Sequence, residues 1–169
     1  MDDIKTTAQK PLRKPEWLKV RAPQGENYAQ IKNMLGELKL ATVCQEARCP
    51  NMGECWSGGT ATFMLMGEVC TRGCKFCNVK TGKPDGVNEK EIDEVTIAVQ
   101  KLGLKFVVIT SPARDDLEDG GALQFYKVTK NILENTSDTQ VELLIPDFKG
   151  NVESIQKVVD SGAVIIGHN

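Results

Sequence analysis

The sequence predicts an α/β fold with a parallel sheet, preceded by an N-terminal extension. From residue 61 onward, four short apolar runs alternate with three longer runs whose apolar residues recur at helical spacing. Strand–helix–strand repeats of this kind build right-handed βαβ units, and both open sheets and barrels satisfy the pattern. All six cysteines lie between Cys44 and Cys77. We therefore divide the chain into an extension, residues 1–60, and an α/β part, residues 61–169.

The extension contains one predicted helix. Residues 1 to about 25 are interrupted by prolines and are locally basic, which excludes a long helix and is typical of a solvated arm. Trp17 and Leu18 mark one point where this arm could dock. Over residues 26–40, apolar residues at helical spacing predict a short amphipathic helix that leads into the first cysteines.

The α/β part contains four expected strands and three expected helices. The strands cover residues 61–67, 104–110, 141–146 and 163–167, and the helices cover residues 88–103, 120–135 and 151–162. A closed (β/α)₈ barrel takes roughly 200 residues or more, and only His168 and Asn169 follow the fourth strand. We therefore expect an incomplete barrel whose last strand has an open edge. Met64 and Met66 are expected in the core of the first strand.

The composition narrows the class of protein. The chain has 169 residues, 40% of them hydrophobic, and a formal net charge of -2, which fits one soluble globular domain or part of a larger one. This balance gives no sign of a nucleic-acid partner. The apolar runs are too short to cross a bilayer, and the opening "MDDIKTT" lacks the features of a secretory signal. We expect a cytoplasmic protein without a membrane partner.

The first cysteine group, "CTRGCKFC", comprises Cys70, Cys74 and Cys77 at C-x3-C-x2-C spacing, directly after the first strand. In a reducing compartment, clustered cysteines favour metal binding over disulfides. Three thiolates can hold three irons of a [4Fe–4S] cluster and leave the fourth iron open. Zinc usually takes four protein ligands in closed sites, so it fits this spacing less well and stays the alternative.

The second cysteine group, "CQEARCPNMGEC", comprises Cys44, Cys49 and Cys55 at C-x4-C-x5-C spacing. It also supplies three ligands, which we expect in a single loop. Either something other than cysteine binds one iron, or the fourth ligand lies elsewhere in the chain. A two-cluster electron carrier is conceivable, although the C-x2-C-x2-C-x3-C-P repeats of such carriers are absent.

The stretch "VCQEARCPNMGECWSGGTATFMLMGEVCTRGCKFCNVKTGKP" resembles lipoyl synthases, a family of radical S-adenosylmethionine (SAM) enzymes. "KPEWLKVRAP", "RDDLEDGGA" and "LIPDFKG" extend the resemblance from Lys14 to Asn169. It implies a radical-SAM-type (β/α) barrel after a cluster-binding extension, with two [4Fe–4S] clusters and SAM as cofactors. It also implies a sulfurtransferase that inserts sulfur at C6 and C8 of an octanoyl chain on a lipoyl carrier protein. The electron donor would be a protein such as ferredoxin or flavodoxin.

The resemblance implies roles for particular residues. The first cysteine group would bind the cluster that contacts SAM, and the second would bind an auxiliary cluster that donates the sulfur atoms. Contacts to SAM or substrate are expected near Asn78, Thr110, Ser111, Arg114 and Asp115. His168 is expected to face the site, since "GHN" resembles the "NHN" of the family.

The chain also departs from the family pattern. Pro112 and Ala113 stand where the family usually has valine and aspartate. Nothing corresponds to the Arg-Ser-Ser-Tyr motif whose serine binds the auxiliary cluster, and Ser57 is expected to be only a loop residue. We therefore expect a chain that lacks a C-terminal half, on the same or on another polypeptide, and that is inactive alone in forming lipoyl groups. The alternative is an iron–sulfur carrier or electron-transfer module without radical chemistry.

Two further features have alternative interpretations. Arg72 and Lys75, inside the first cysteine group, could lower the pKa values of the thiols and balance the charge of a cluster, or could simply face solvent. Arg114, Asp115 and Asp116 could form a salt-bridged turn, and the family resemblance adds a possible role beside the cofactor.

Overall fold

The computed structural model describes residue 15 and residues 25–38, 40–58 and 60–168. Trp17 and Leu18, the expected docking point of the N-terminal arm, lie outside the described residues. Among the helices that are described, none is long and apolar enough to cross a membrane.

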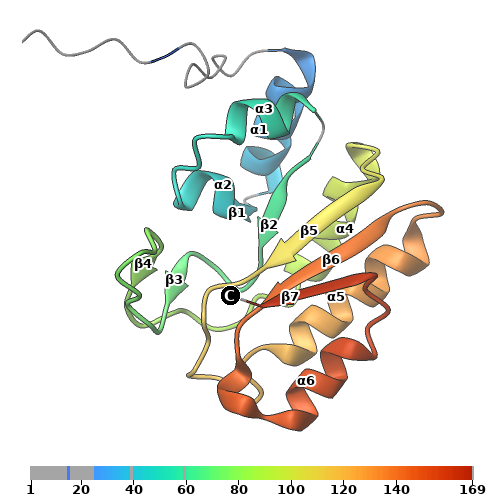
Figure 1. Ribbon diagram of the computed structural model, residues 1–169. Coiled ribbons are helices and arrows are strands. Elements are labelled where there is room, and N and C mark those ends of the chain that lie inside the picture. Colours follow the sequence, from blue (N-terminus) through green and yellow to red (C-terminus); the bar gives the residue numbers. More distant parts are fainter. Residues whose placement is uncertain (1–14, 16–24, 39, 59, 169) are drawn as a thin grey trace, which may run out of the picture.

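The main sheet has five strands in the order β1-β2-β5-β6-β7 (Figure 1). Four of them are parallel and confirm the four expected strands: β2 (Thr62–Met64), β5 (Phe106–Thr110), β6 (Gln140–Ile145) and β7 (Ile165–His168). Each parallel strand pairs with the next one along the chain, as in a barrel, without the reversal of order that marks a doubly wound fold. This arrangement confirms the α/β class and is that of a partial (β/α) fold.

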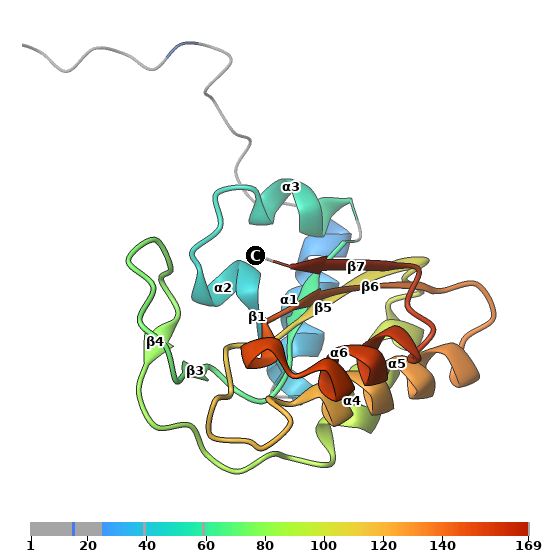
Figure 2. The same ribbon diagram turned by 60° about the horizontal axis from the view of Figure 1, so that its bottom comes forward.

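The expected helices of the α/β part are confirmed and lie along one face of the sheet in both views (Figures 1 and 2). They are α4 (Glu91–Lys101), α5 (Ala122–Asn135) and α6 (Val152–Val159). Successive strand residues point to opposite faces, so every second residue is buried beneath the helices, namely Val107, Ile109, Val141 and Leu143. From α5, apolar residues three and four positions apart complete this layer: Phe125, Val128 and Ile132.

The extension packs onto this sheet. Its helix α1 (Glu26–Leu38) confirms the expected one, and the unexpected strand β1 (Ala41–Thr42) pairs antiparallel with β2. The Trp56 ring is buried and lies 5.2 Å from the Tyr28 ring. The buried residues of the extension belong to the same apolar cluster as those of β5 and β6.

The second cysteine group does not lie in a single loop, which corrects our expectation. It lies on two short helices, α2 (Val43–Glu46) and α3 (Met52–Ser57), and on the turn between them. The buried Thr42 side chain caps α2, because its hydroxyl accepts a hydrogen bond from the Gln45 backbone N–H at 3.3 Å. A capping threonine two residues before the first cysteine is the local signal that the spacing alone did not reveal.

Strand β2 ends three residues earlier than the apolar run suggested. Met66 and Gly67 adopt left-handed backbone conformations, with φ of 65° and 87°. The Met66 backbone N–H then points at the Glu91 carboxylate, 3.0 and 2.9 Å from its two oxygens. The chain turns here into a two-strand parallel ladder that was not expected, formed by β3 (Val69–Cys70) and β4 (Lys80–Thr81).

The last strand, β7, lies at the edge of the sheet and pairs only with β6 among the described residues. Its apolar side chains are substantially exposed, with Ile165 at 47% and Ile166 at 37%. The adjacent Val164 is 54% exposed. This edge has the open, apolar character that we expected from the sequence.

Candidate functional site

The first cysteine group lies on the β3–β4 excursion, at the carboxyl end of the parallel strands. Gly82 donates a backbone hydrogen bond to the Cys70 carbonyl at 2.9 Å, and Cys77 donates one to the Cys74 carbonyl at 3.0 Å. Thr71 ties the loop to the segment after β5, because its N–H and its hydroxyl both donate to the Ala113 carbonyl, at 3.0 and 2.9 Å. The group therefore has a defined place above the sheet.

A cavity of about 450 Å³ lies between this loop and the strand ends. Cys70, Cys74 and Cys77 are among its lining residues. So are residues at the ends of four parallel strands and just after them: Met64, Thr110, Ser111, Leu144, Ile145 and His168. The carboxyl ends of strands are where (β/α) folds hold their reaction sites. The cavity is the candidate site.

The polar groups of the cavity wall differ in their hydrogen bonding. Thr110 is buried, and its hydroxyl donates to the Leu144 carbonyl at 2.8 Å. The His168 ring nitrogen Nδ1 lies 3.0 Å from the Ile145 carbonyl oxygen. The Ser111 hydroxyl is buried and has no hydrogen-bond partner among the described residues. An unpaired buried hydroxyl is costly, so a polar ligand in the cavity would supply what Ser111 lacks.

The departures Pro112 and Ala113 also line the cavity. The contact that Ala113 makes to the cysteine loop uses its backbone carbonyl, which accepts from Thr71. Any residue at position 113 can make this bond, so the loop does not depend on the aspartate that the family usually has there.

The Arg72 side chain binds two carboxylates, and Arg72 and Asp147 also line the cavity. Its guanidinium donates two hydrogen bonds to Asp115, at 2.6 and 2.8 Å, and two to Asp147, at 2.8 and 2.7 Å. The hydrogen bonds to these carboxylates, Asp115 first, raise the pKa of Arg72, and those from Arg72 lower the pKa of Asp115 and of Asp147. Neither interpretation of Arg72 from the sequence anticipated this double pairing.

Arg114 is not brought to the cavity. Its side chain is 1% exposed and donates to the Asp116 carboxylate at 2.9 and 2.7 Å, which confirms a salt-bridged turn. It also donates to the backbone carbonyls of Met66 at 3.1 Å and Asp85 at 2.8 Å. Arg114 therefore joins the end of β2, the segment before α4 and the β5–α5 connection. The hydrogen bonds from Arg114 lower the pKa of Asp116.

Asn78 links the two cysteine groups. Its side-chain amide donates to the Glu46 carbonyl at the end of α2, at 3.0 Å. Val43, at the start of α2, lines the cavity. The second cysteine group therefore begins beside the cavity that the first group lines.

The second group presents three free thiols with different exposure. Cys44 is buried, Cys49 is half-buried and Cys55 is exposed. Nearby protein atoms partly desolvate the Cys55 thiol and raise its pKa, and the neighbouring Cys44 and Cys49 raise it further. Ser57 is part of α3, and its hydroxyl donates to the Gly53 carbonyl at 2.6 Å.

The donor set of each group fits a [4Fe–4S] cluster, because each supplies three free thiols and such a cluster binds each thiolate at a different iron. Among the described residues, no three histidine, cysteine or carboxylate side chains converge on a point that one metal ion could occupy. All six cysteines are free, and the three of the first group line one cavity.

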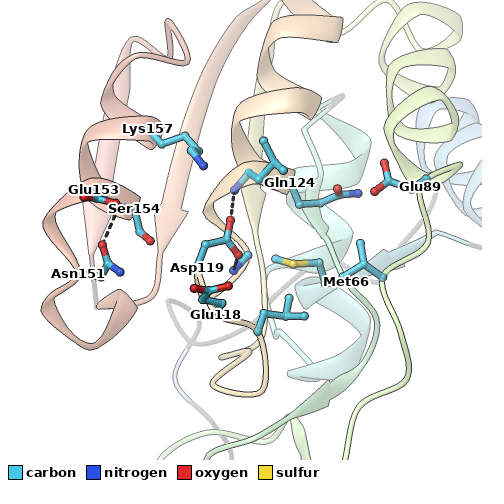
Figure 3. Close-up of a pocket in the computed structure, with 13 residues that line it drawn as sticks. Met66, Glu89, Glu118, Asp119, Gln124, Asn151, Glu153, Ser154 and Lys157 are labelled. Atoms are coloured by element: carbon cyan, nitrogen blue, oxygen red, sulfur yellow. Dashed lines mark hydrogen bonds between the residues drawn. The ribbon is translucent and has the colours of Figure 1, made fainter.

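A second cavity of about 430 Å³ lies between the N-terminal ends of α5 and α6 (Figure 3). Carboxylates dominate its polar lining, and Lys157 is the single cation among its lining residues. The carboxylates are those of Glu89, Glu118, Asp119 and Glu153. Asp119 is engaged in accepting from the N–H groups at the start of α5. None of the described residues that line this second cavity is a cysteine.

Two functional contacts escaped the sequence reasoning. "LIPDFKG" carried no assigned role, yet Asp147 binds Arg72 and the Lys149 ammonium donates to the Asp115 carbonyl at 3.1 Å. The one available signal was an acidic residue directly after a strand, which the parallel sheet brings to the same edge as the cysteines.

Comparisons with known proteins place both parts of the chain. A family model described as the N-terminal domain of lipoyl synthase matches residues 1–49, and one described as the radical SAM superfamily matches residues 64–169. The chain is 49% identical over 158 residues to lipoyl synthase of Halorhodospira halophila, covering 93% of this chain and 47% of that protein.

Two other relatives are also lipoyl synthases. Identity to lipoyl synthase of Halobacterium salinarum is 52% over 161 residues, or 93% of this chain and 52% of that protein. Identity to the mitochondrial lipoyl synthase of Drosophila ananassae is 50% over 164 residues, which cover 94% of this chain and 44% of that protein. The chain spans about half the length of the curated relatives it matches.

Proposed function

This chain belongs to the lipoyl synthase family of the radical SAM superfamily, and we propose that it forms the cluster- and SAM-binding part of an enzyme that inserts two sulfur atoms into a protein-bound octanoyl chain. One observation carries the proposal. Three free cysteines and the ends of four parallel strands line the same cavity of about 450 Å³.

The cysteines would hold two [4Fe–4S] clusters, the first group beside the cavity and the second beyond α2. When bound, these clusters and SAM supply one-electron cleavage of a sulfonium and the sulfur to be inserted, chemistry that side chains do not offer. The first group would supply three thiolates to its cluster, which leaves room for a further ligand in the cavity. Ser111 presents the unpaired hydroxyl that such a ligand could engage.

The chain's own residues also shape the cavity. Met64, Leu144 and Ile145 give it apolar walls that limit access of water to a reactive intermediate. Thr110 keeps β5 in register with β6 through its bond to Leu144. For Asn78, Arg114 and Asp115, the hydrogen bonds support a role in holding the surrounding segments in place.

The partners in this proposal are an octanoylated lipoyl carrier domain and an electron donor such as ferredoxin or flavodoxin. A further β-strand, from a C-terminal half on the same or another polypeptide, would pair with the exposed edge of β7. We propose a cytoplasmic location, because six free cysteines suit a reducing compartment. The relative from Drosophila ananassae carries the word mitochondrial in its name.

The test is anaerobic reconstitution of the chain with iron and sulfide, followed by addition of SAM and a strong reductant. We expect about eight irons and eight sulfides per chain, and formation of methionine and 5′-deoxyadenosine. Replacing Cys70, Cys74 and Cys77 together by alanine should leave about half of the iron and abolish SAM cleavage. Stoichiometric zinc without acid-labile sulfide would refute the proposal.

The matched control is the triple alanine variant of Cys44, Cys49 and Cys55. It should lose a similar amount of iron but keep SAM cleavage. An electron-transfer module would show the same losses of iron in both variants and no SAM cleavage in any of them. The family comparisons do not favour that alternative.

A further inference from the structure

We propose that Arg72 is a positioning residue that holds the first cysteine group against the cavity by binding the carboxylates of Asp115 and Asp147. The inference deepens the proposed function and rests on it, since it concerns how the cluster-binding loop is aligned with the ligand space. Through Arg72, the segment that follows β2 is bound to the segments that follow β5 and β6.

The geometry supports a rigid connection. Arg72 lies between Cys70 and Cys74, and its own N–H lies 3.3 Å from the Cys70 sulfur. Its planar guanidinium forms two hydrogen bonds with each carboxylate, all between 2.6 and 2.8 Å. Paired bonds of this kind fix direction as well as distance. Asp115 is 43 residues from Arg72 in sequence and Asp147 is 75 residues away, so the contact joins distant segments.

The two carboxylates are themselves fixed. The Asp115 N–H donates to the Thr71 hydroxyl at 3.1 Å, so residues 71 and 72 both bind the segment after β5. Asp147 accepts from the Lys149 N–H at 2.9 Å.

The loop that carries Asp147 is conformationally unusual. Phe148 and Lys149 have φ of 45° and 53°, a left-handed region that disfavours such residues. Phe148 is buried and its ring meets the Phe125 ring edge-on, with centroids 6.2 Å apart. Packing therefore holds the loop in the conformation that aims Asp147 at Arg72.

This arrangement has a consequence for the cysteines. The loop includes the exposed Cys74 and Cys77. Its other restraints are backbone and side-chain hydrogen bonds of Thr71, Asn78, Thr81 and Gly82, none of which joins it to two strand ends at once. With Arg72 anchored to two strand ends, the thiols keep a constant relation to the cavity. Lysine cannot reproduce this, because an ammonium lacks the fork that binds two carboxylates at once.

The first experiment measures hydrogen–deuterium exchange in the metal-free full chain. In Arg72→Met we expect the amides of Thr71, Asp115 and Lys149 to exchange about tenfold faster, while amides of β6 keep their wild-type rates. Arg72→Lys should fall between the two. The control is Lys75→Met, which removes the same charge from the same loop at an exposed residue without an ion pair to any described residue.

Unchanged exchange at those three amides in Arg72→Met would overturn the proposal, and so would equal acceleration throughout the sheet. Should Arg72→Met fail to fold, Asp147→Asn decides the question. It removes one charge from the contact and should accelerate the amides of Thr71 and Lys149. These measurements need no cluster, so they stand even if the proposed function fails.

The second experiment separates positioning from simple stability. In the variant lacking the second cysteine group, the reduced first cluster is observed by electron paramagnetic resonance with and without SAM. Arg72→Met should bind wild-type amounts of iron and sulfide but show about a fivefold smaller SAM-induced change at a concentration half-saturating for wild type. An identical SAM response would overturn the positioning role. Absence of iron and sulfide from the wild-type chain would instead refute the proposed function.

Discussion

Replacing Arg114 by methionine should lower the stability of the chain severely while leaving its capacity to bind iron and sulfide intact. Arg114 is 1% exposed and donates four hydrogen bonds, two to the Asp116 carboxylate and two to the backbone carbonyls of Met66 and Asp85. Methionine fills much of the same volume but donates none of them. The buried Met66 carbonyl and the part-buried contact to the Asp85 carbonyl would then lose their charged donor.

The magnitude follows from these contacts. A hydrogen bond to a charged group contributes about 1.5–3 kcal/mol, so two such contacts amount to about 3–6 kcal/mol. Because the Asp85 contact is only part-buried, the loss should lie in the lower half of this range. We add little for Asp116, because its side chain is 36% exposed and water can replace the lost donor. With a typical urea dependence of about 2 kcal/mol per molar, the unfolding midpoint should fall by about 2 M.

The assay is urea unfolding of the metal-free chain, followed by circular dichroism. Arg72→Met is the matched control, since that arginine also donates four hydrogen bonds but is 31% exposed, and it should lose only about 1 kcal/mol. Equal losses in the two variants, or a loss below about 1 kcal/mol in Arg114→Met, would refute the assignment of Arg114 to structure. A direct contact with SAM would then have to be reconsidered.

Three other predictions concern stability and association. Burial raises the pKa of Glu91 above its ordinary 4.5, so the folded state binds the proton more tightly than the unfolded state does. The stability of the wild-type chain should therefore increase as pH falls from that raised value towards 4.5. The urea midpoint of Glu91→Gln should not show this increase. Gly121→Ala should cost about 1–3 kcal/mol in thermal unfolding, because the new methyl would lie 2.5 Å from the Met66 sulfur at a φ of +90°, whereas Gly86→Ala meets no atom within 4 Å and should cost little. Ile165→Lys should reduce self-association of the chain in sedimentation experiments, because Ile165 is 47% exposed on the edge strand; an unchanged mass distribution would contradict this.

The strands and helices could be predicted because their signals are local. Val107 and Ile109 alternate with less buried neighbours, and Val128 and Ile132 recur one helical turn apart, so each element carries its own pattern. Strands β1, β3 and β4 were missed because each has only two residues, which is too short to show the alternating hydrophobic pattern of a strand. Helices α2 and α3 were missed because the cysteine spacing alone does not indicate a helix. The one local helix signal is the cap at Thr42.

The candidate site could be predicted only in part. The cysteine spacing and the position of Thr110 and Ser111 after a strand are written in the sequence, and the parallel sheet brings them to one edge. That Asn78 reaches α2 could not be predicted, since Glu46 lies 32 residues away and its backbone carbonyl has no sequence signature.

The sequence by itself determined the family, the two cysteine groups and the order of the four parallel strands and the three helices that follow the extension, because motif spacing and hydrophobic periodicity are properties of neighbouring residues. Only the tertiary structure decided what the two arginines do. Sequence placed Arg72 beside thiols and Arg114 beside two carboxylates, whereas the fold directs Arg72 to Asp115 and Asp147 and buries Arg114 on two carbonyls. A guanidinium binds whichever acceptors lie in reach of its fork, and the parallel sheet brings those acceptors together from distant parts of the chain.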